Sequence, residues 1–72
     1  MKKYIVIHFD SLYGSIVKRQ EIEGTSLRQV FDDLTKGEID FEEQEYQGQI
    51  NMDMGVLDWN FEDIRMTIVE LN

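Results

Sequence analysis

Residues 24–37 read GTSLRQVFDDLTKG, and this stretch decides the fold because it carries the clearest helix signal in the chain. Ser26 followed by Gln29 has the spacing of a capping box, in which two side chains satisfy backbone N–H groups at the helix start. The apolar residues then recur at the spacing of one helical face, at Leu27, Val30, Phe31 and Leu34. Gly37 stands where a left-handed C-terminal cap is expected. We therefore predict a helix over residues 26–36.

Strands are predicted on both sides of this helix. Residues 3–9, KYIVIHF, are apolar on both faces of a two-residue period, which is typical of a central strand covered on both faces. Residues 10–15 have turn composition, and residues 15–22 alternate more weakly, so we expect a hairpin with a more exposed second strand. Residues 63–71 predict a closing strand, because Ile64, Met66 and Ile68 share one face of it.

The pattern is weakest between the helix and the closing strand. Residues 38–45 favour a strand or loop, with a short helix capped by Asp40 as the alternative. Residues 44–54 have room for one or two short strands around Gly48, and residues 57–61 for a turn or a single helical turn.

The predicted class is α+β: a single domain over residues 1–72, in the order ββαβ(β), with one helix packed on a mixed sheet. This order resembles that of ubiquitin-like β-grasp domains, and the resemblance spans almost the whole chain. It implies that the first and last strands lie side by side at the centre of the sheet. The chain ends VELN rather than in the Gly-Gly tail of ubiquitin-like modifiers, so neither conjugation nor thiocarboxylate chemistry is expected.

Composition narrows the function classes. The formal net charge is −8, and the seven Lys and Arg residues are dispersed, which argues against direct binding to nucleic acid or to an anionic membrane. There is no cysteine, so disulfides and thiolate chemistry are excluded. The apolar run after Met1 is too short for a secretion signal or a membrane span, and a cytoplasmic protein is the expectation.

Charge is concentrated between Gly37 and Ile64, where nine acidic residues occur without any lysine or arginine. If residues 38–45 are extended, alternate carboxylates project from one face at intervals of roughly 6.8 Å. Such a row could imitate a phosphate backbone. The apolar members of the segment, Phe41, Tyr46, Ile50 and Val56, are expected to point inward. The candidate partner-binding residues are Glu38, Asp40, Glu42, Glu43, Glu45, Asp58, Trp59, Glu62 and Asp63.

Two interpretations of Trp59 stay open. In a loop beside acids it would be an exposed anchor for a basic partner. It could instead fold back and cap the open end of the core.

No catalytic, metal-binding or cofactor-binding residues are predicted. His8 lies near Asp10 and Ser11, but His8 and Asp10 point to the same face of one strand, and no large concave site is expected in so small a chain. Residues 51–62 do not fit a calcium loop, because Gly55 falls at position 5 and Val56 at position 6. The glycines are too far apart to form a phosphate-binding loop.

We therefore expect a small acidic, non-enzymatic binding module, monomeric or weakly dimeric, whose partner is a protein with a basic surface. One form of this expectation is an inhibitor that imitates nucleic acid. The alternative is a structural or assembly protein that acts through a sheet edge or as a homo-oligomer. In that case the acidic face serves only solubility.

Overall fold

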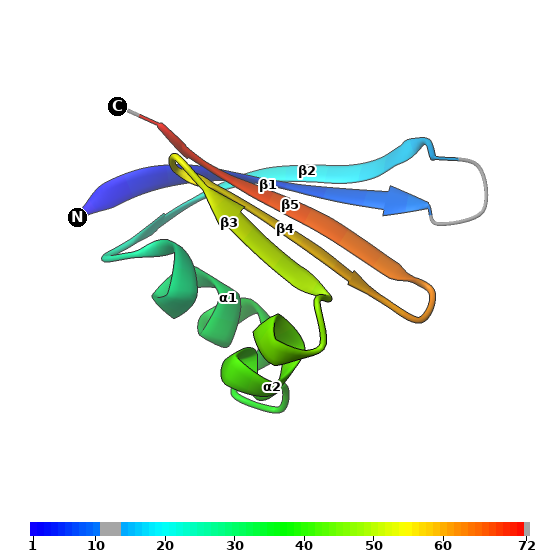
Figure 1. The fold of residues 1–72 in the computed structure, drawn as a ribbon. Helices are drawn as coiled ribbons and strands as arrows, with labels where there is room; N and C mark the ends of the chain where they lie inside the picture. Colours follow the sequence, from blue (N-terminus) through cyan, green and yellow to red (C-terminus); the bar gives the residue numbers. More distant parts are fainter. Residues whose placement is uncertain (11–13, 72) are drawn as a thin grey trace.

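A computed structural model of the 72-residue chain describes residues 1–10 and 14–71, so part of the predicted turn at residues 10–15 lies outside the described residues. Five strands and two helices follow one another along the chain (Figure 1). Their bounds are β1 (Lys2–Asp10), β2 (Ile16–Gly24), α1 (Leu27–Thr35), α2 (Phe41–Tyr46), β3 (Ile50–Asp53), β4 (Val56–Phe61) and β5 (Ile64–Leu71).

The five strands form one sheet in the order β2-β1-β5-β4-β3, with every neighbouring pair antiparallel. The first and last strands are adjacent at its centre, where Val6 pairs with Ile68. The expectation of a mixed sheet is wrong. The helices carry the chain from one sheet edge to the other, and β3 starts in the direction of β2. The chain then turns back after β3 and again after β4. As a result β5 runs in the same direction as β2 and β3, antiparallel to β1.

α1 matches the predicted helix closely. The Ser26 hydroxyl oxygen accepts from the Gln29 backbone N–H at 3.1 Å, and the Gln29 side-chain oxygen accepts from the Thr25 N–H at 2.8 Å, one residue before the usual capping-box position. The helix ends at Lys36, which is left-handed with φ of 57°, and Gly37 continues the turn with φ of 69°. Lys36 is thus the C-terminal cap itself.

Two of the weaker predictions are corrected by the structure. Residues 57–61 belong to strand β4, not to a turn or a helical turn. The preferred strand or loop at residues 38–45 is also wrong: the alternative, a short helix capped by Asp40, is α2. The sheet is therefore covered by two helices instead of one.

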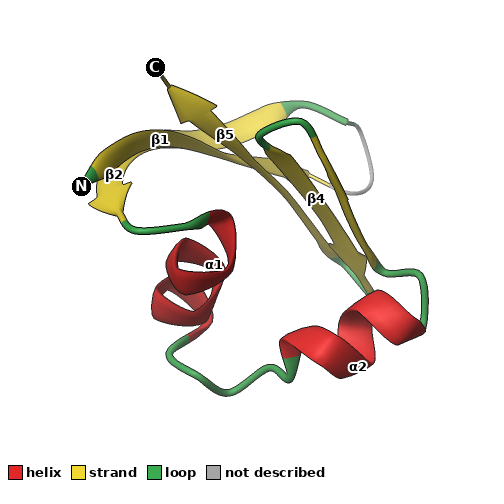
Figure 2. Ribbon diagram, turned by 60° about the vertical axis from the view of Figure 1, so that its left-hand side comes forward, coloured by secondary structure: helices red, strands yellow, loops and turns green. Residues whose placement is uncertain are grey.

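Both helices lie on the same side of the curved sheet (Figure 2). The core fills the space between the helices and the sheet, because alternate residues of the central strands point toward the helices. It is a single cluster of Tyr4, Val6, Val30, Phe31, Phe41, Ile50, Leu57, Trp59, Met66 and Ile68. The three rings Phe31, Phe41 and Trp59 meet edge to face at its centre, with centroids 5.6 Å (Phe31 to Phe41) and 5.0 Å (Phe31 to Trp59) apart.

The other side of the sheet carries no helix, so the prediction that residues 3–9 are covered on both faces is wrong. The apolar residues that point to this side are only half-buried; we call them the open face, and they are Ile5, Ile7, Phe9, Val56, Val69 and Leu71. The Arg65 guanidinium lies 4.8 Å from the centre of the Phe9 ring and shields it in part. The chain has too few elements to cover a second face.

Across residues 1–10 and 14–71, none of the helices is long and apolar enough to cross a membrane.

Candidate interaction surface

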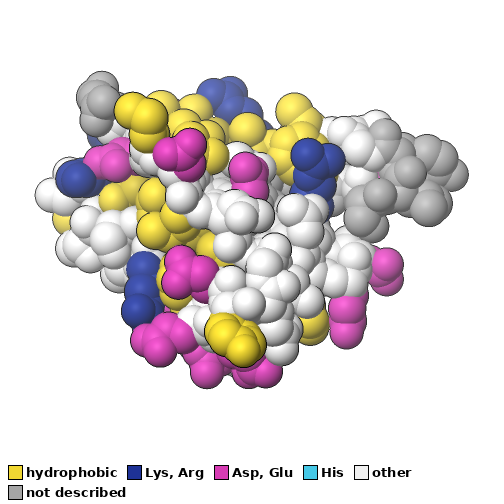
Figure 3. All heavy atoms as spheres, in the orientation of Figure 1, with side chains coloured by type: hydrophobic (Ala, Val, Ile, Leu, Met, Phe, Trp, Pro, Cys, Tyr) yellow, Lys and Arg dark blue, Asp and Glu magenta, His cyan; other side chains and the backbone are white. Residues whose placement is uncertain are grey.

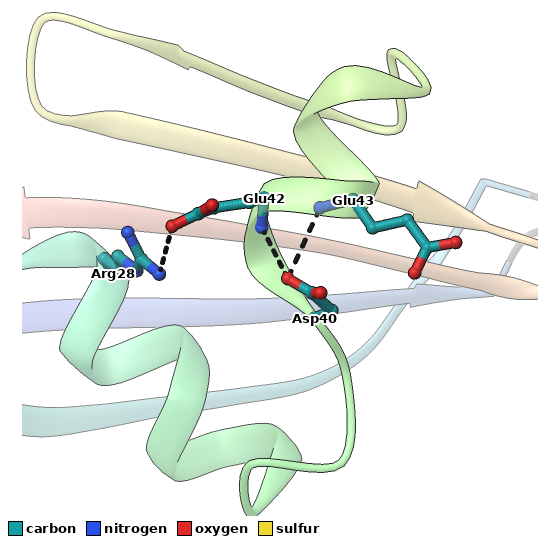
Figure 4. A network of polar contacts seen from close by, with 4 residues as sticks. All are labelled: Arg28, Asp40, Glu42 and Glu43. Atoms are coloured by element: carbon teal, nitrogen blue, oxygen red, sulfur yellow. Dashed lines mark hydrogen bonds and ion pairs between the residues drawn. The ribbon is translucent and has the colours of Figure 1, made fainter.

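α2 is the element that organises the acidic segment. Its N-terminal cap is Asp40, whose carboxylate oxygen accepts from the backbone N–H groups of Glu42 at 3.0 Å and Glu43 at 3.4 Å (Figure 4). Negative side chains in the first turn of a helix also interact favourably with its dipole. Asp40, Glu42 and Glu43 therefore stabilise the start of α2, whatever else they do.

The helical conformation replaces the predicted row of carboxylates. Phe41 and Gln44, three residues apart, turn into the core. Glu42, Glu43 and Glu45 are left exposed around the rest of the helix. The predicted row of carboxylates along an extended strand is thus wrong, because these residues are helical. The three carboxylates still lie together on one short helix.

One of these carboxylates is paired. Glu42 accepts from the Arg28 guanidinium at 3.2 Å (Figure 4). The same guanidinium lies 5.0 Å from the centre of the Phe41 ring. Arg28 thereby joins α1 to α2. In the described part of the chain the one other salt bridge links Lys2 to Glu70 at 2.8 Å. The hydrogen bond to Glu70 and the negative charge of Glu70 raise the pKa of the Lys2 ammonium.

Trp59 is not an exposed anchor. It is 4% exposed, and its indole N–H donates to the side-chain oxygen of Gln44 at 2.8 Å, inside the core. The alternative interpretation, in which Trp59 completes the core, describes it better. Gln44 is itself 7% exposed, so this hydrogen bond satisfies two buried polar groups at once.

The remaining candidates do not all meet the acids of α2. Asp58 lies between the buried residues Leu57 and Trp59, so it points to the opposite side of the sheet, where it accepts from the Thr67 hydroxyl at 2.6 Å. Glu62 and Asp63 form the exposed turn between β4 and β5, with Glu62 at a positive φ of 53°. Glu38 is exposed in the loop between the helices.

Sequence reasoning missed Tyr46. We expected it to point inward, yet it is 91% exposed at the end of α2, next to Glu45. The spacing could have revealed this, because Phe41 and Gln44 define the inner face of the helix and Tyr46 falls outside it. Acidic side chains gather at the bottom of the space-filling view, in the region that α2 occupies in Figure 1 (Figure 3). We call Glu42, Glu43, Glu45 and Tyr46 the α2 surface.

The cavity that His8 lines brings few other ionisable side chains together. It contains one carboxylate, that of Glu38. Within the described ranges, no three acidic or histidine side chains converge as metal ligands would. Ser11 lies outside the described residues.

Comparison of the chain with protein-family models, with curated proteins and with solved structures gives no significant match.

Proposed function

We propose that this chain is a small, acidic, non-enzymatic binding module of the cytoplasm that engages a basic protein surface through the α2 surface. Three exposed carboxylates and an exposed tyrosine on six consecutive residues support this. Carboxylates steer a cationic partner toward the site, and tyrosine is among the residues that most often dominate binding energy.

Tyr46 is the observation that carries the proposal. Acids alone could serve only solubility, but an aromatic ring that is 91% exposed beside them contributes nothing to the core. A ring in this position can pack against a partner and can also lie over a partner's Lys or Arg. Imitation of nucleic acid is a narrower form of the proposal. The carboxylates that would imitate phosphates are those around the helix α2, in place of a row along a strand.

The β-grasp resemblance is part of the same proposal. The adjacent first and last strands support it, whereas the antiparallel pairing of β1 with β5 differs from the mixed sheet that it implied.

The experiment compares two variants with the same change in charge. In the first, Glu42, Glu43 and Glu45 are replaced by Gln. In the second, three exposed acids outside α2, Glu21, Glu23 and Asp53, are replaced by Gln, Gln and Asn. The proteins are immobilised, exposed to extract of the native host and eluted with increasing salt, and Tyr46→Ala is tested separately.

We expect a partner that elutes within the first few hundred millimolar salt, where the Debye length shortens toward 3 Å. The α2 variant and Tyr46→Ala should lose this partner, and the matched variant should retain it. Equal loss from both triple variants would reduce the acids to a general charge effect. A partner indifferent to salt would rule the proposal out.

A second candidate function is assembly through the open face, since half-buried apolar side chains on an uncovered sheet are typical of interfaces. Its centre is Ile5, Ile7 and Val69, with Arg19 beside Ile7 and Glu21 beside Ile5 on the neighbouring strand. Sheet-on-sheet packing across a two-fold axis can bring Arg19 opposite Glu21 of a second copy. Sedimentation at several concentrations tests this, because a monomer at high concentration would exclude it.

A further inference from the structure

Among the described residues, the outer edge of β2 is the longer of the two edges of the sheet. β2 stands at one end of the strand order and spans nine residues, whereas β3 at the other end spans four. From Lys18 to Gly24 the pairing of β2 with β1 is regular, because its register shift lies beyond Lys18, next to Phe9. A regular edge of this length is a template for a further strand.

The hydrogen-bond pattern of the sheet indicates which backbone groups of β2 face outward. Successive residues of an antiparallel strand direct their N–H and C=O groups to its two sides in alternation. The pattern starts at β4, where the Glu70 N–H donates to the Gly55 carbonyl oxygen at 2.8 Å, and the registers of β5 and β1 carry it to β2. The β2 residues whose N–H and C=O groups point to solvent are then Arg19, Glu21 and Glu23.

The charges of β2 complement themselves in one register. Two copies of a strand that pair antiparallel across a two-fold axis place one residue opposite its own copy. Within residues 18–23, KRQEIE, a charged residue at the axis would face an identical charge, which is destabilising and leaves Gln20 and Ile22. With Ile22 at the axis, Glu21 lies opposite Glu23. With Gln20 at the axis, Arg19 of each copy lies opposite Glu21 of the other.

The register centred on Gln20 also fits the backbone and the exposure of the side chains. Arg19 and Glu21 both direct their backbone groups outward, so each such pair exchanges two hydrogen bonds. Both side chains are exposed, and they lie on the open-face side of the sheet, next to Ile7 and Ile5 of β1. The opposite charges therefore meet at the surface, without the cost of burying them.

We propose that the β2 edge binds the β2 edge of a second copy of this chain, antiparallel and with Gln20 at the two-fold axis. The sheet then continues across both copies. α2 leads directly into β3, at the far end of each sheet, so both α2 surfaces stay accessible and the dimer presents two of them to a partner. The overlap is a few residues long, so we expect a weak dimer with a dissociation constant on the order of 100 µM.

Exchanging the charges of Arg19 and Glu21 tests the register. Arg19→Glu and Glu21→Arg each place like charges opposite one another, so each variant should sediment as a monomer up to about 1 mM, tenfold above the expected constant. Glu21→Arg should do so although it lowers the net negative charge. Mixed together, the two variants should associate, because one chain then carries two acids and the other two bases at these positions. The double exchange keeps the net charge of −8 and should restore the dimer.

Amide exchange separates this interface from packing through the open face, which can also bring Arg19 opposite Glu21. As the concentration of the wild-type chain rises, the N–H groups of Arg19 and Glu21 should exchange more slowly. The N–H of Met52, which points outward from the edge of β3 by the same alternation, should keep its rate. A dimer without protection at Arg19 and Glu21 would belong to another surface and would overturn the proposal.

Two further results would overturn it. A wild-type chain that stays monomeric at about 1 mM would leave the β2 edge free for an extended segment of a different protein. Single-exchange variants that do not associate when mixed would rule out the register. The dimer and the protein partner can be lost separately, because Glu21→Gln in the matched variant described above removes an attraction at this edge and leaves the α2 surface intact.

Discussion

At the scale of single residues, the hydrogen bond between Gln44 and Trp59 is a buried polar contact within the apolar core. It joins α2 to β4, and both side chains are almost fully buried. An amide in the core is tolerated because the indole N–H and the amide oxygen satisfy each other. This pair explains why the only tryptophan of an acidic segment lies inside the molecule.

Replacing Gln44 by Leu should lower the free energy of unfolding by about 1–3 kcal/mol, because the buried indole N–H loses its acceptor. Urea unfolding followed by circular dichroism measures this. The effect should shrink when Trp59 is also replaced by Phe, since no donor is then left unpaired. Additive losses in the double variant would show that the hydrogen bond is not what the glutamine contributes.

His8 should make stability depend on pH. Its folded pKa lies below the ordinary 6.5, so the unfolded chain binds the proton more readily. The contribution of the neutral ring to the free energy of unfolding is therefore fully present above about pH 6.5, and it is lost as the pH falls through the folded pKa. The charged groups nearby are Lys18 on β2 and Lys36 and Glu38 at the cavity.

The measurement is the difference in unfolding free energy between wild type and His8→Phe at pH 5 to 7.5. We expect wild type to lose stability relative to the variant as the pH falls. The 15 carboxylates titrate in both proteins and largely cancel in the difference. A constant difference across this range would mean that the folded and unfolded pKa values of His8 are the same.

At the scale of elements, the short hairpin between β3 and β4 departs most from what its sequence favours. Its turn is Met54-Gly55, and both residues have positive φ, 44° and 83°. Two-residue turns of this kind strongly favour Asn-Gly, because asparagine adopts the left-handed region with less strain than other non-glycine residues. Met54 is 96% exposed, so its side chain adds little to packing.

Met54→Asn should raise the free energy of unfolding by roughly 1 kcal/mol, the order of the strain relieved. Thermal unfolding followed by circular dichroism measures it, and Met54→Leu, which keeps the strained conformation, should leave stability unchanged. No gain with asparagine would mean that the turn is not of the primed type.

At the scale of the whole molecule, charge repulsion opposes folding. The net charge is −8, and residues 1–10 and 14–71 contain only two salt bridges, both partly exposed. Exposed pairs of this kind contribute little. Salt screens repulsion over the whole surface, whereas it weakens only these two attractions.

Stability should therefore rise between 10 and 300 mM NaCl. A gain of about 1 kcal/mol corresponds to an increase of about 4–8 °C in the Tm of a chain this size. The triple Gln variant of α2 should show a smaller increase, because it starts with less repulsion. A Tm that falls with salt would indicate that specific ion pairs outweigh the general repulsion.

Patterns with clear periodicity were the ones that sequence could predict. Residues 26–36 combine helical spacing with caps, and the two central strands have apolar residues at strand spacing. These elements form with small differences at their ends. β4 alternates as clearly, with Leu57, Trp59 and Phe61 separated by polar residues, and this signal was missed. In residues 38–45 the acids suggested an extended row, although Asp40 is a good N-terminal cap.

The sequence by itself determined an α+β chain with a helix after a hairpin, a closing strand and an acidic middle segment, because spacing and caps are local properties. Only the tertiary structure decided which side chains of that segment are available. Packing against Phe31 turns Phe41 and Trp59 inward and leaves Tyr46 outside. The physical reason is that one helix face and one sheet face are buried together, and which residues meet there depends on contacts between elements far apart in the chain.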